Sequence, residues 1–345
     1  MEPLKKKQQH SVVKSAIYFA FGTMMSRVLG LVRDSLLVSI FGTTISDAYF
    51  AAFRFPNLFR RIFGEGALSA CFIPLYIEYK EKQDRKSLAQ LTAGVLGLLM
   101  LTLLPFSLII SMSMDWMIPL WVSGKGFSQV PGKLEMTVTM TKIMFPFLIL
   151  VSLYAYFMAL LNANKKFLLS SMASSFLNLS VIGACLWCYW NKNLSPVVLS
   201  WSVILGGFLQ FIVLIPGLRG LNIPFNLSWS SIFSPPVKRT LKAFMPSVLG
   251  LGIIQFMALI NTYFASTLTE GAVSYVYLAD RLLELPLSLI AVSLGTAILP
   301  SLSEKLSQNN HEHFKIELSD NLKLLLFLCI PSAVGMWMTA DILVP

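Results

Sequence analysis

The sequence predicts an all-α protein that crosses a membrane several times. Hydrophobic residues make up 55% of the 345 residues and charged residues only 13%, whereas soluble domains are about a quarter charged. Apolar runs of about 20 residues, the length that a membrane-spanning helix needs, recur along the whole chain. Composition and the spacing of these runs therefore indicate a polytopic helical membrane protein.

Nine membrane-spanning helices are predicted. The second and the eighth are longer than a bilayer requires, which favours tilt or extension into the cytoplasm. The predicted ranges are 13–41, 46–79, 88–113, 136–161, 167–190, 196–217, 240–266, 272–302 and 318–340.

The distribution of basic residues predicts a cytoplasmic N-terminus, because cytoplasmic loops carry an excess of Lys and Arg. The flanks on the side opposite to the N-terminus hold only Lys125, Lys133 and Lys192. The flanks on the N-terminal side hold Lys5, Lys6, Lys7, Lys14, Lys80, Lys82, Arg85, Lys86, Lys165, Lys166, Arg219, Lys238, Arg239, Lys242, Lys305 and Lys315.

The longest cytoplasmic connection divides the chain into two lobes. Residues 1–217 are predicted as an N-terminal lobe of six spans, 218–239 as a linker rich in Pro, Asn and Ser, and 240–345 as a partial C-terminal lobe of three spans. The linker includes a candidate amphipathic segment for the membrane surface.

A faint internal repeat relates the two lobes. A shift of 226 residues aligns Tyr49 with Tyr275 and Pro74 with Pro300. Six spans separate the copies, so the repeat is parallel, with its axis along the membrane normal. Since the second lobe has only three spans, we expect the chain to be part of a longer protein.

Arginines within the apolar spans are the main functional signal. An arginine at the bilayer centre costs about 2.5–3.5 kcal/mol on insertion scales, so several of them are expected to face a wet cavity. Guanidinium groups suit phosphate oxygens, and a diphosphate engages several at once. The hypothesis is an anion site made of Arg27, Arg33, Arg60 and Arg281.

An alternative is that the arginines pair with nearby acids and only lock helices together. Arg54 and Arg61 are predicted as such structural members, because they lie seven residues apart in line with Asp47, and Glu65 lies four beyond Arg61. Pro56 is expected to kink this helix. The supporting charges are Asp34, Asp47, Arg54, Arg61, Glu65, Asp280 and Glu284.

Other chemistry is not indicated. The Cys185–Cys188 pair lies inside an apolar span and favours helix packing over metal or redox chemistry. The three histidines, His10, His311 and His313, lie in polar flanks without companion ligands, so no metal site is expected. Although the net charge is +10, the cations lie in short loops or within spans, which argues against nucleic-acid binding. Neither a cofactor nor an enzymatic activity is predicted.

Three stretches resemble the MurJ/MviN family of lipid II flippases. They are SRVLGLVRD at 26–34, SDAYFAAFRFPNLFRRIFGEGALSACFIPLYIEYK at 46–80 and LADRLLELP at 278–286. The resemblance implies the multidrug/oligosaccharidyl-lipid/polysaccharide exporter fold, in which two lobes of six helices surround a central cavity, with two further helices at the C-terminus. It also implies the bacterial cytoplasmic (inner) membrane and transport of lipid II, an undecaprenyl-diphosphate glycolipid, by alternating access.

The resemblance extends to individual charges. The family's essential basic positions match Arg27, Arg33, Arg60 and Arg281, with acidic companions at Asp34, Asp47 and Glu65, and the family often has lysine at the position of Arg54. Sodium coupling in some members uses an acid in the seventh helix. The corresponding position here is Asn261, so the coupling ion stays open.

Several other functions remain as alternatives. The cargo could be another polyprenyl-linked glycan, or the chain could be a non-transporting, truncated scaffold that binds peptidoglycan-synthesis proteins. An integral-membrane transferase acting on a polyprenyl phosphate is the rival enzyme. Such an enzyme needs acidic metal ligands or a histidine base, and here the acids are interleaved with arginines. Membrane lipids are expected partners in every case.

Overall fold

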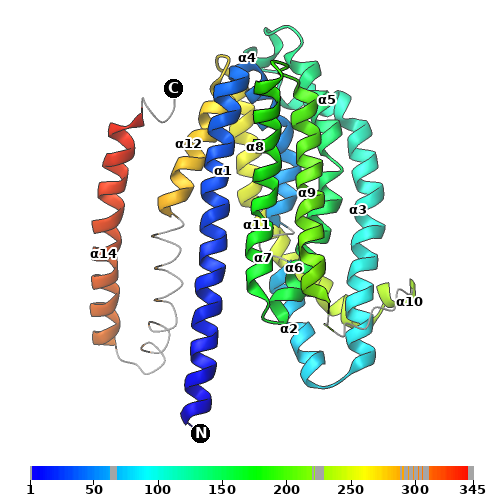
Figure 1. The fold of residues 1–345 in the computed structure, drawn as a ribbon, viewed down its shortest axis with the longest axis vertical. Coiled ribbons are helices and arrows are strands. Elements are labelled where there is room, and N and C mark those ends of the chain that lie inside the picture. Colours follow the sequence, from blue (N-terminus) through cyan, green and yellow to red (C-terminus); the bar gives the residue numbers. More distant parts are fainter. Residues whose placement is uncertain are drawn as a thin grey trace. The chain divides into compact units, whose positions relative to one another are not determined.

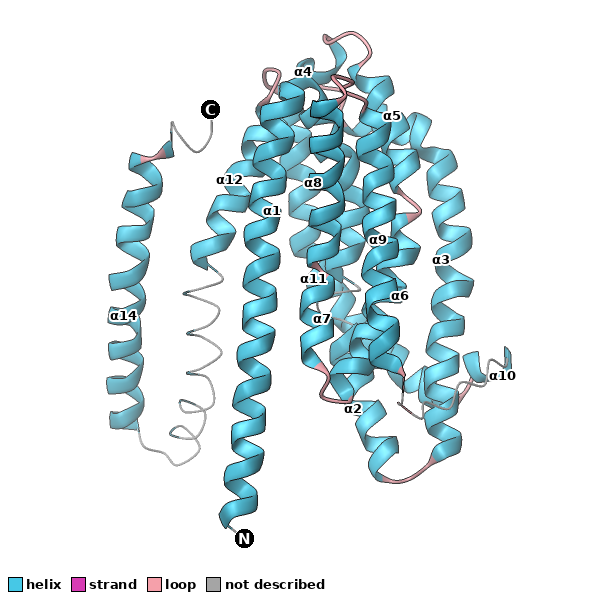
Figure 2. Cartoon of the chain, in the orientation of Figure 1, coloured by secondary structure: helices cyan, strands magenta, loops and turns pink. Residues whose placement is uncertain are grey.

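A computed structural model of the chain describes residues 2–62, 68–219, 221, 229–287 and 311–340, with isolated positions 290, 294, 298, 302 and 305. Every regular element among these residues is a helix (Figures 1 and 2). The helices are α1 (Glu2–Phe59), α2 (Leu68–Glu81), α3 (Arg85–Trp121), α4 (Lys125–Ser128), α5 (Lys133–Met144), α6 (Phe147–Ala163), α7 (Phe167–Ala173), α8 (Ser175–Trp190), α9 (Pro196–Leu218), α10 (Trp229–Ile232), α11 (Pro235–Thr267), α12 (Ala272–Pro286) and α14 (His311–Met338).

Seven helical segments of the described residues are long and apolar enough to cross a membrane, which confirms the predicted polytopic helical class. They are Gly22–Ile62, Arg85–Trp121, Lys133–Ala163, Leu169–Trp190, Pro196–Leu218, Pro235–Thr267 and Glu312–Met338. These seven segments are two fewer than the nine membrane-spanning helices that we predicted. The first segment covers two predicted spans, and the predicted span 272–302 runs into positions that lie mostly outside the described residues, so nine stays a prediction.

The long helix α1 changes direction at Gly42. This residue has φ +70° and ψ 178°, a backbone conformation that glycine adopts far more readily than other residues. The Ser46 hydroxyl donates to the Leu37 carbonyl at 3.4 Å, so the residues before and after the turn lie close together. The predicted boundary between the first two spans therefore falls at a glycine turn. Pro56 lies within the helix after this turn, and the kink that we expected there stays a prediction.

Two further predicted spans each consist of two helices in the structure. The predicted span 136–161 consists of α5 and α6, separated next to Pro146, which has no N–H to donate to the helix. The predicted span 167–190 consists of α7 and α8, which meet at Ser174.

Helix α3 starts at a cap in which the Asp84 carboxylate accepts from the Ser87 backbone N–H at 3.0 Å. Donation by the Ser87 hydroxyl and N–H lowers the pKa of Asp84.

The described chain divides into two compact units, residues 1–274 and 275–345. In the first unit α9 packs against α6 and α8, while α1 packs against α5, α7 and α8 (Figure 1). Glycines permit the close approach of α9, since a Cβ at Gly206 would lie 2.8 Å from the Leu177 side chain. In the second unit α14 is the long helix. The predicted lobes 1–217 and 240–345 and the linker 218–239 remain a prediction.

Part of the predicted linker is docked on α3. The carbonyl oxygen of Ser231, in α10, lies where a Cβ at Gly94 would approach it to 2.3 Å, and Val237 Cγ2 would be 2.5 Å away. A Cβ at Gly97, one turn further on, would lie 3.1 Å from the flexible side chain of Ile232. The two glycines therefore form a notch that receives α10.

Gly94→Ala is expected to displace α10 and to destabilise the packing by about 1–3 kcal/mol, because the added methyl group overlaps backbone rather than a movable side chain. Limited proteolysis should cleave the segment 220–234 faster in this variant. Gly97→Ala is the matched control and should change the cleavage rate little. Equal cleavage of both variants and the unaltered chain would contradict the docking.

Candidate functional site

Arg33 is buried in a polar cluster on the first half of α1. Its side chain is 2% exposed and that of Asp34 is fully buried. Arg33 Nε and Nη2 lie 2.7 and 2.6 Å from Asp34 Oδ1, and the guanidinium carbon is 5.8 Å from the centre of the Phe53 ring. Asp34 is paired with its sequence neighbour Arg33, because the long arginine side chain can fold back onto the next residue.

Asn178 on α8 links that helix to α1 through two hydrogen bonds. Its Oδ1 accepts from Arg33 Nη1 at 3.1 Å, and its Nδ2 donates to the Ser26 carbonyl at 2.8 Å. A single amide thereby contacts the two ends of the segment that carries Arg27 and Arg33. Arg27 itself is half-buried. Sequence reasoning missed Asn178, although an asparagine in an otherwise apolar helix was a usable signal.

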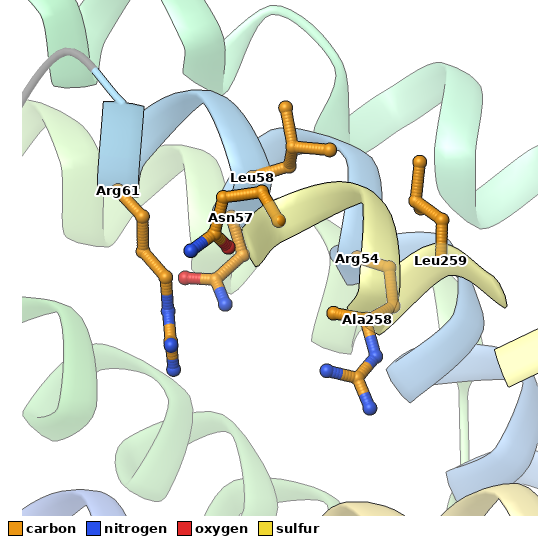
Figure 3. A pocket seen from close by; sticks show the side chains of 7 residues that line it. Arg54, Asn57, Leu58, Arg61, Ala258 and Leu259 are labelled. Atoms are coloured by element: carbon orange, nitrogen blue, oxygen red, sulfur yellow. The ribbon is translucent and has the colours of Figure 1, made fainter. Parts of the chain in front are cut away.

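Three more arginines lie near the end of the segment Gly22–Ile62, Arg54 on α1 and Arg60 and Arg61 in the turn that follows it. Arg60 Nε donates to Asn57 Oδ1 at 2.9 Å, and residues 60–62 form a π turn, a feature frequent at functional sites. Arg54 and Arg61 line a pocket between α1 and α11 (Figure 3). The pocket is small, and its described lining residues are Arg54, Asn57, Leu58, Arg61, Gln255, Ala258 and Leu259. The sequence predicted Arg54 and Arg61 as structural members, and that role stays a prediction.

Trp121 holds the two walls of this pocket together. Its indole Nε1 donates to the Leu259 carbonyl at 3.1 Å, and its ring meets that of Phe55 edge-on with centroids 4.8 Å apart. The side chain is therefore engaged between α1, α3 and α11.

Asp47 forms a separate buried cluster near the turn of α1. Its carboxylate accepts from Lys133 Nζ at 2.7 Å, from the N–H groups of Gly271 and Ser274 at 2.8 and 2.7 Å, and from the Ser274 hydroxyl at 2.6 Å. Lys133 Nζ also donates to the Gly126 carbonyl at 2.8 Å. Asp47 is therefore directed at the start of α12 and does not line the pocket of Arg54 and Arg61.

The side chain of Lys133 is fully buried, although the sequence placed this residue only in the flank of a predicted span. Gly132, with φ +74°, turns the chain immediately before α5 and directs Lys133 inward. The two members of the ion pair are 86 residues apart, so no local pattern revealed the contact.

The charges of α12 lie in the second unit. Arg281 Nη1 is 2.8 Å from Glu284 Oε2, and both side chains are partly exposed. Asp280 is exposed. The convergence of Arg281 with Arg27, Arg33 and Arg60 stays a prediction, and Glu65 lies outside the described residues.

A metal centre is not found among the residues that the structure describes: none of their His, Cys, Asp and Glu side chains form a group of three or more that could hold an ion. Cys185 and Cys188 are buried free thiols, as expected for helix packing. Asn261, the position compared with the coupling residue of some flippases, is exposed on α11.

Known proteins were compared with the chain. The family profile described as "Lipid II flippase MurJ" matches residues 37–344. A "Probable lipid II flippase MurJ" from Bdellovibrio bacteriovorus is 37% identical over 341 residues, which are 97% of this chain and 64% of that protein. The "Lipid II flippase MurJ" of Burkholderia cenocepacia is 34% identical and is matched over 92% of this chain and 62% of its own length. The chain thus spans slightly less than two thirds of the length of these relatives.

Solved structures support the predicted exporter-type bundle. The fold is similar to that of a multidrug resistance MATE family transporter of the MOP superfamily in an inward-facing conformation. The TM-score is 0.70 at 14% identity, over 95% of this chain and 74% of the other. An outward-facing conformation of a MATE family transporter gives 0.65 at 12% identity, over 96% of this chain and 72% of the other. At such identities the likeness concerns the fold alone, whereas the profile match and the sequence relatives show that the chain belongs to the lipid II flippase MurJ family.

Proposed function

We propose that the chain moves lipid II from the cytoplasmic to the outer leaflet of the bacterial inner membrane by alternating access. The observation that carries this proposal is the set of arginines held by polar partners within the candidate membrane-spanning segment Gly22–Ile62. The names of the relatives identify lipid II as their substrate. The basic flanks favour a cytoplasmic N-terminus, so that the site first opens toward the leaflet in which the lipid is made.

The proposed role of Arg27, Arg33, Arg60 and Arg281 is to bind the diphosphate. Each guanidinium group carries five N–H donors and keeps its charge at all physiological pH values. Hydrogen bonds from a charged donor contribute about 1.5–3 kcal/mol each, so three or four arginines suffice to hold a diphosphate reversibly.

The partners of these arginines set their orientation. Asn57 and Asn178 are neutral amides, which fix a guanidinium group without neutralising its charge. Asp34 offsets the charge of Arg33 while the site is empty of substrate, which limits the cost of a buried cation. We propose that the diphosphate replaces part of this compensation when it binds.

The membrane-facing side chains fit the rest of such a cargo. Large exposed apolar residues cover the spans, among them Leu108 and Met112 on α3 and Ile253 and Phe256 on α11. The polyprenyl tail would remain in lipid alongside such surfaces, and the sugar-peptide head would cross in water. Contacts with peptidoglycan-synthesis proteins are part of the proposal.

Complementation tests the proposal in cells. Expression of the chain should restore growth of a bacterial strain depleted of its lipid II flippase, and Arg27→Ala, Arg33→Ala or Arg281→Ala should each abolish rescue while expression persists. Arg85→Ala, at an exposed position before the third span, is the control and should rescue fully. Full rescue by all three variants would exclude the proposed site, and failure of the unaltered chain would exclude transport by this chain.

A further inference from the structure

Helix α11 contacts other helices of the first unit along its whole length, starting at its N-terminal end. Arg239 Nη1 donates to Glu78 Oε1 on α2 at 3.0 Å. Two turns further along α11, Ser247 Oγ lies 3.8 Å from the sulfur of Cys71, which also belongs to α2. The position on α2 falls as the position on α11 rises, so the two helices lie antiparallel and side by side.

The C-terminal half of α11 is held by α1, α3 and α4. The Leu259 carbonyl accepts from the indole N–H of Trp121 on α3 at 3.1 Å, and Leu259 faces Asn57 across the small pocket (Figure 3). Near the end of α11 the fully buried Ser266 lies against the backbone before α4, since a Cβ at Gly124 would be 2.2 Å from the Ser266 carbonyl oxygen. Backbone packed this closely on backbone leaves no room for the end of α11 to slide.

A bend at Pro246 would not free either half of α11. Proline removes one backbone hydrogen bond from a helix, and Pro246 stands between the two sets of contacts. On its N-terminal side Val237 is fully buried, and a Cβ at Gly94 on α3 would lie 2.5 Å from the Val237 side chain. On its C-terminal side the contacts from Ser247 to Ser266 hold the rest of the helix.

The connection between α11 and α12 is a suitable pivot. Residues 268–271 join the two helices, and Gly271 has φ +89°, where glycine changes conformation at little steric cost. Hinges are a few loop residues that absorb a large change in φ and ψ. The boundary between the two compact units falls directly after Ser274. Asp47 accepts from the N–H groups of Gly271 and Ser274, and Lys133 keeps the carboxylate paired when these two bonds open.

We propose that α11 moves with the first unit during alternating access and that the pivot between the moving bodies is the connection around Gly271. The inference rests on the proposed function, since it names the place at which the motion of that transport cycle occurs. It departs from the lobes predicted from sequence, in which the linker 218–239 separates the bodies and the second lobe begins with residue 240.

A cross-link between α2 and α11 tests whether these helices separate during transport. Ser247→Cys places a second sulfur opposite the natural Cys71, where an approach of about 2 Å from the present 3.8 Å closes a disulfide. Translocation of fluorescent lipid II in proteoliposomes should be equally fast after oxidation with copper phenanthroline and after reduction. Ser247→Cys combined with Cys71→Ala cannot cross-link and controls for other effects of the oxidant.

Two results of this experiment would overturn the proposal. Transport that stops on oxidation in the cross-linked variant and continues in the control would show that α11 leaves α2 during the cycle. A sulfur pair that stays reduced in the presence of the oxidant would contradict the packing of α11 on α2.

Spin-label distances locate the pivot without a transport assay. With the four natural cysteines replaced by alanine, Met112→Cys on α3 is labelled together with Ile253→Cys on α11 or with Phe327→Cys on α14, all at exposed positions. In the chain without lipid II, the first pair should give a narrow distance distribution and the second a broader one, and lipid II should shift only the second. Equal widths, a shift of the first pair, or no shift of the second pair by bound lipid II would overturn the pivot.

The two proposals fail separately. Absence of transport in both the unaltered chain and the reduced Ser247→Cys variant would refute the proposed function, while the widths measured without lipid II would still decide whether α11 belongs to the first moving body. Transport that stops only on cross-linking would refute the pivot and leave the proposed function intact.

Discussion

Asp47→Ala is expected to destabilise the protein by about 3–5 kcal/mol, the usual effect of removing one member of a buried ion pair. The substitution leaves Lys133 buried without its carboxylate and removes the acceptor for the N–H groups of Gly271 and Ser274. The loss of stability is measured as a lower midpoint of thermal unfolding of the purified chain in detergent, with size-exclusion chromatography as the readout of the folded fraction.

A double-mutant cycle separates the charge from the hydrogen bonds. Lys133→Met alone removes the buried cation, and Asp47→Leu combined with Lys133→Met leaves no buried charge at this site. The double variant should therefore recover much of the stability that Asp47→Leu loses. A stability of Asp47→Ala equal to that of the unaltered chain would contradict the buried cluster.

Asp34→Ala is expected to cost about 3 kcal/mol or more, because Arg33 then stays 2% exposed without the carboxylate that accepts from it. The same thermal unfolding assay measures this effect. Asp115→Ala is the matched control, since it breaks the ion pair with Lys142, in which the two side chains are 66% and 38% exposed. An exposed pair contributes about 0–1 kcal/mol, so this control should unfold almost as the unaltered chain does. Equal losses in the two variants would show that Arg33 is solvated.

The apolar pattern predicted most of the fold. Runs of apolar residues marked the spans, and the predicted gap between the first two spans contains Gly42, where the structure turns. The arginines were also found from sequence, because a cation in an apolar run is conspicuous. What the pattern could not predict was their individual environment. Arg33 is buried and Arg54 borders a pocket, although both lie in similar apolar surroundings along the chain.

The contacts that distinguish these arginines join distant parts of the sequence. Asn178 reaches Arg33 across 145 residues, and Lys133 reaches Asp47 across 86. Lys133 lies in the flank of a predicted span, so its local sequence gave no sign that its side chain would be buried. The pocket needs α11 beside the second half of α1, which only the packed structure provides.

Binding of lipid II to the purified chain, measured by native mass spectrometry, tests the central claim most directly. The claim is that arginines of the spans hold the diphosphate. The unaltered chain and Arg85→Ala should bind lipid II equally, whereas Arg33→Ala and Arg281→Ala should each bind it at least about tenfold more weakly, which corresponds to the loss of one charge-assisted hydrogen bond. Equal binding by all four proteins would leave these arginines as pairing residues between helices and would contradict the diphosphate site.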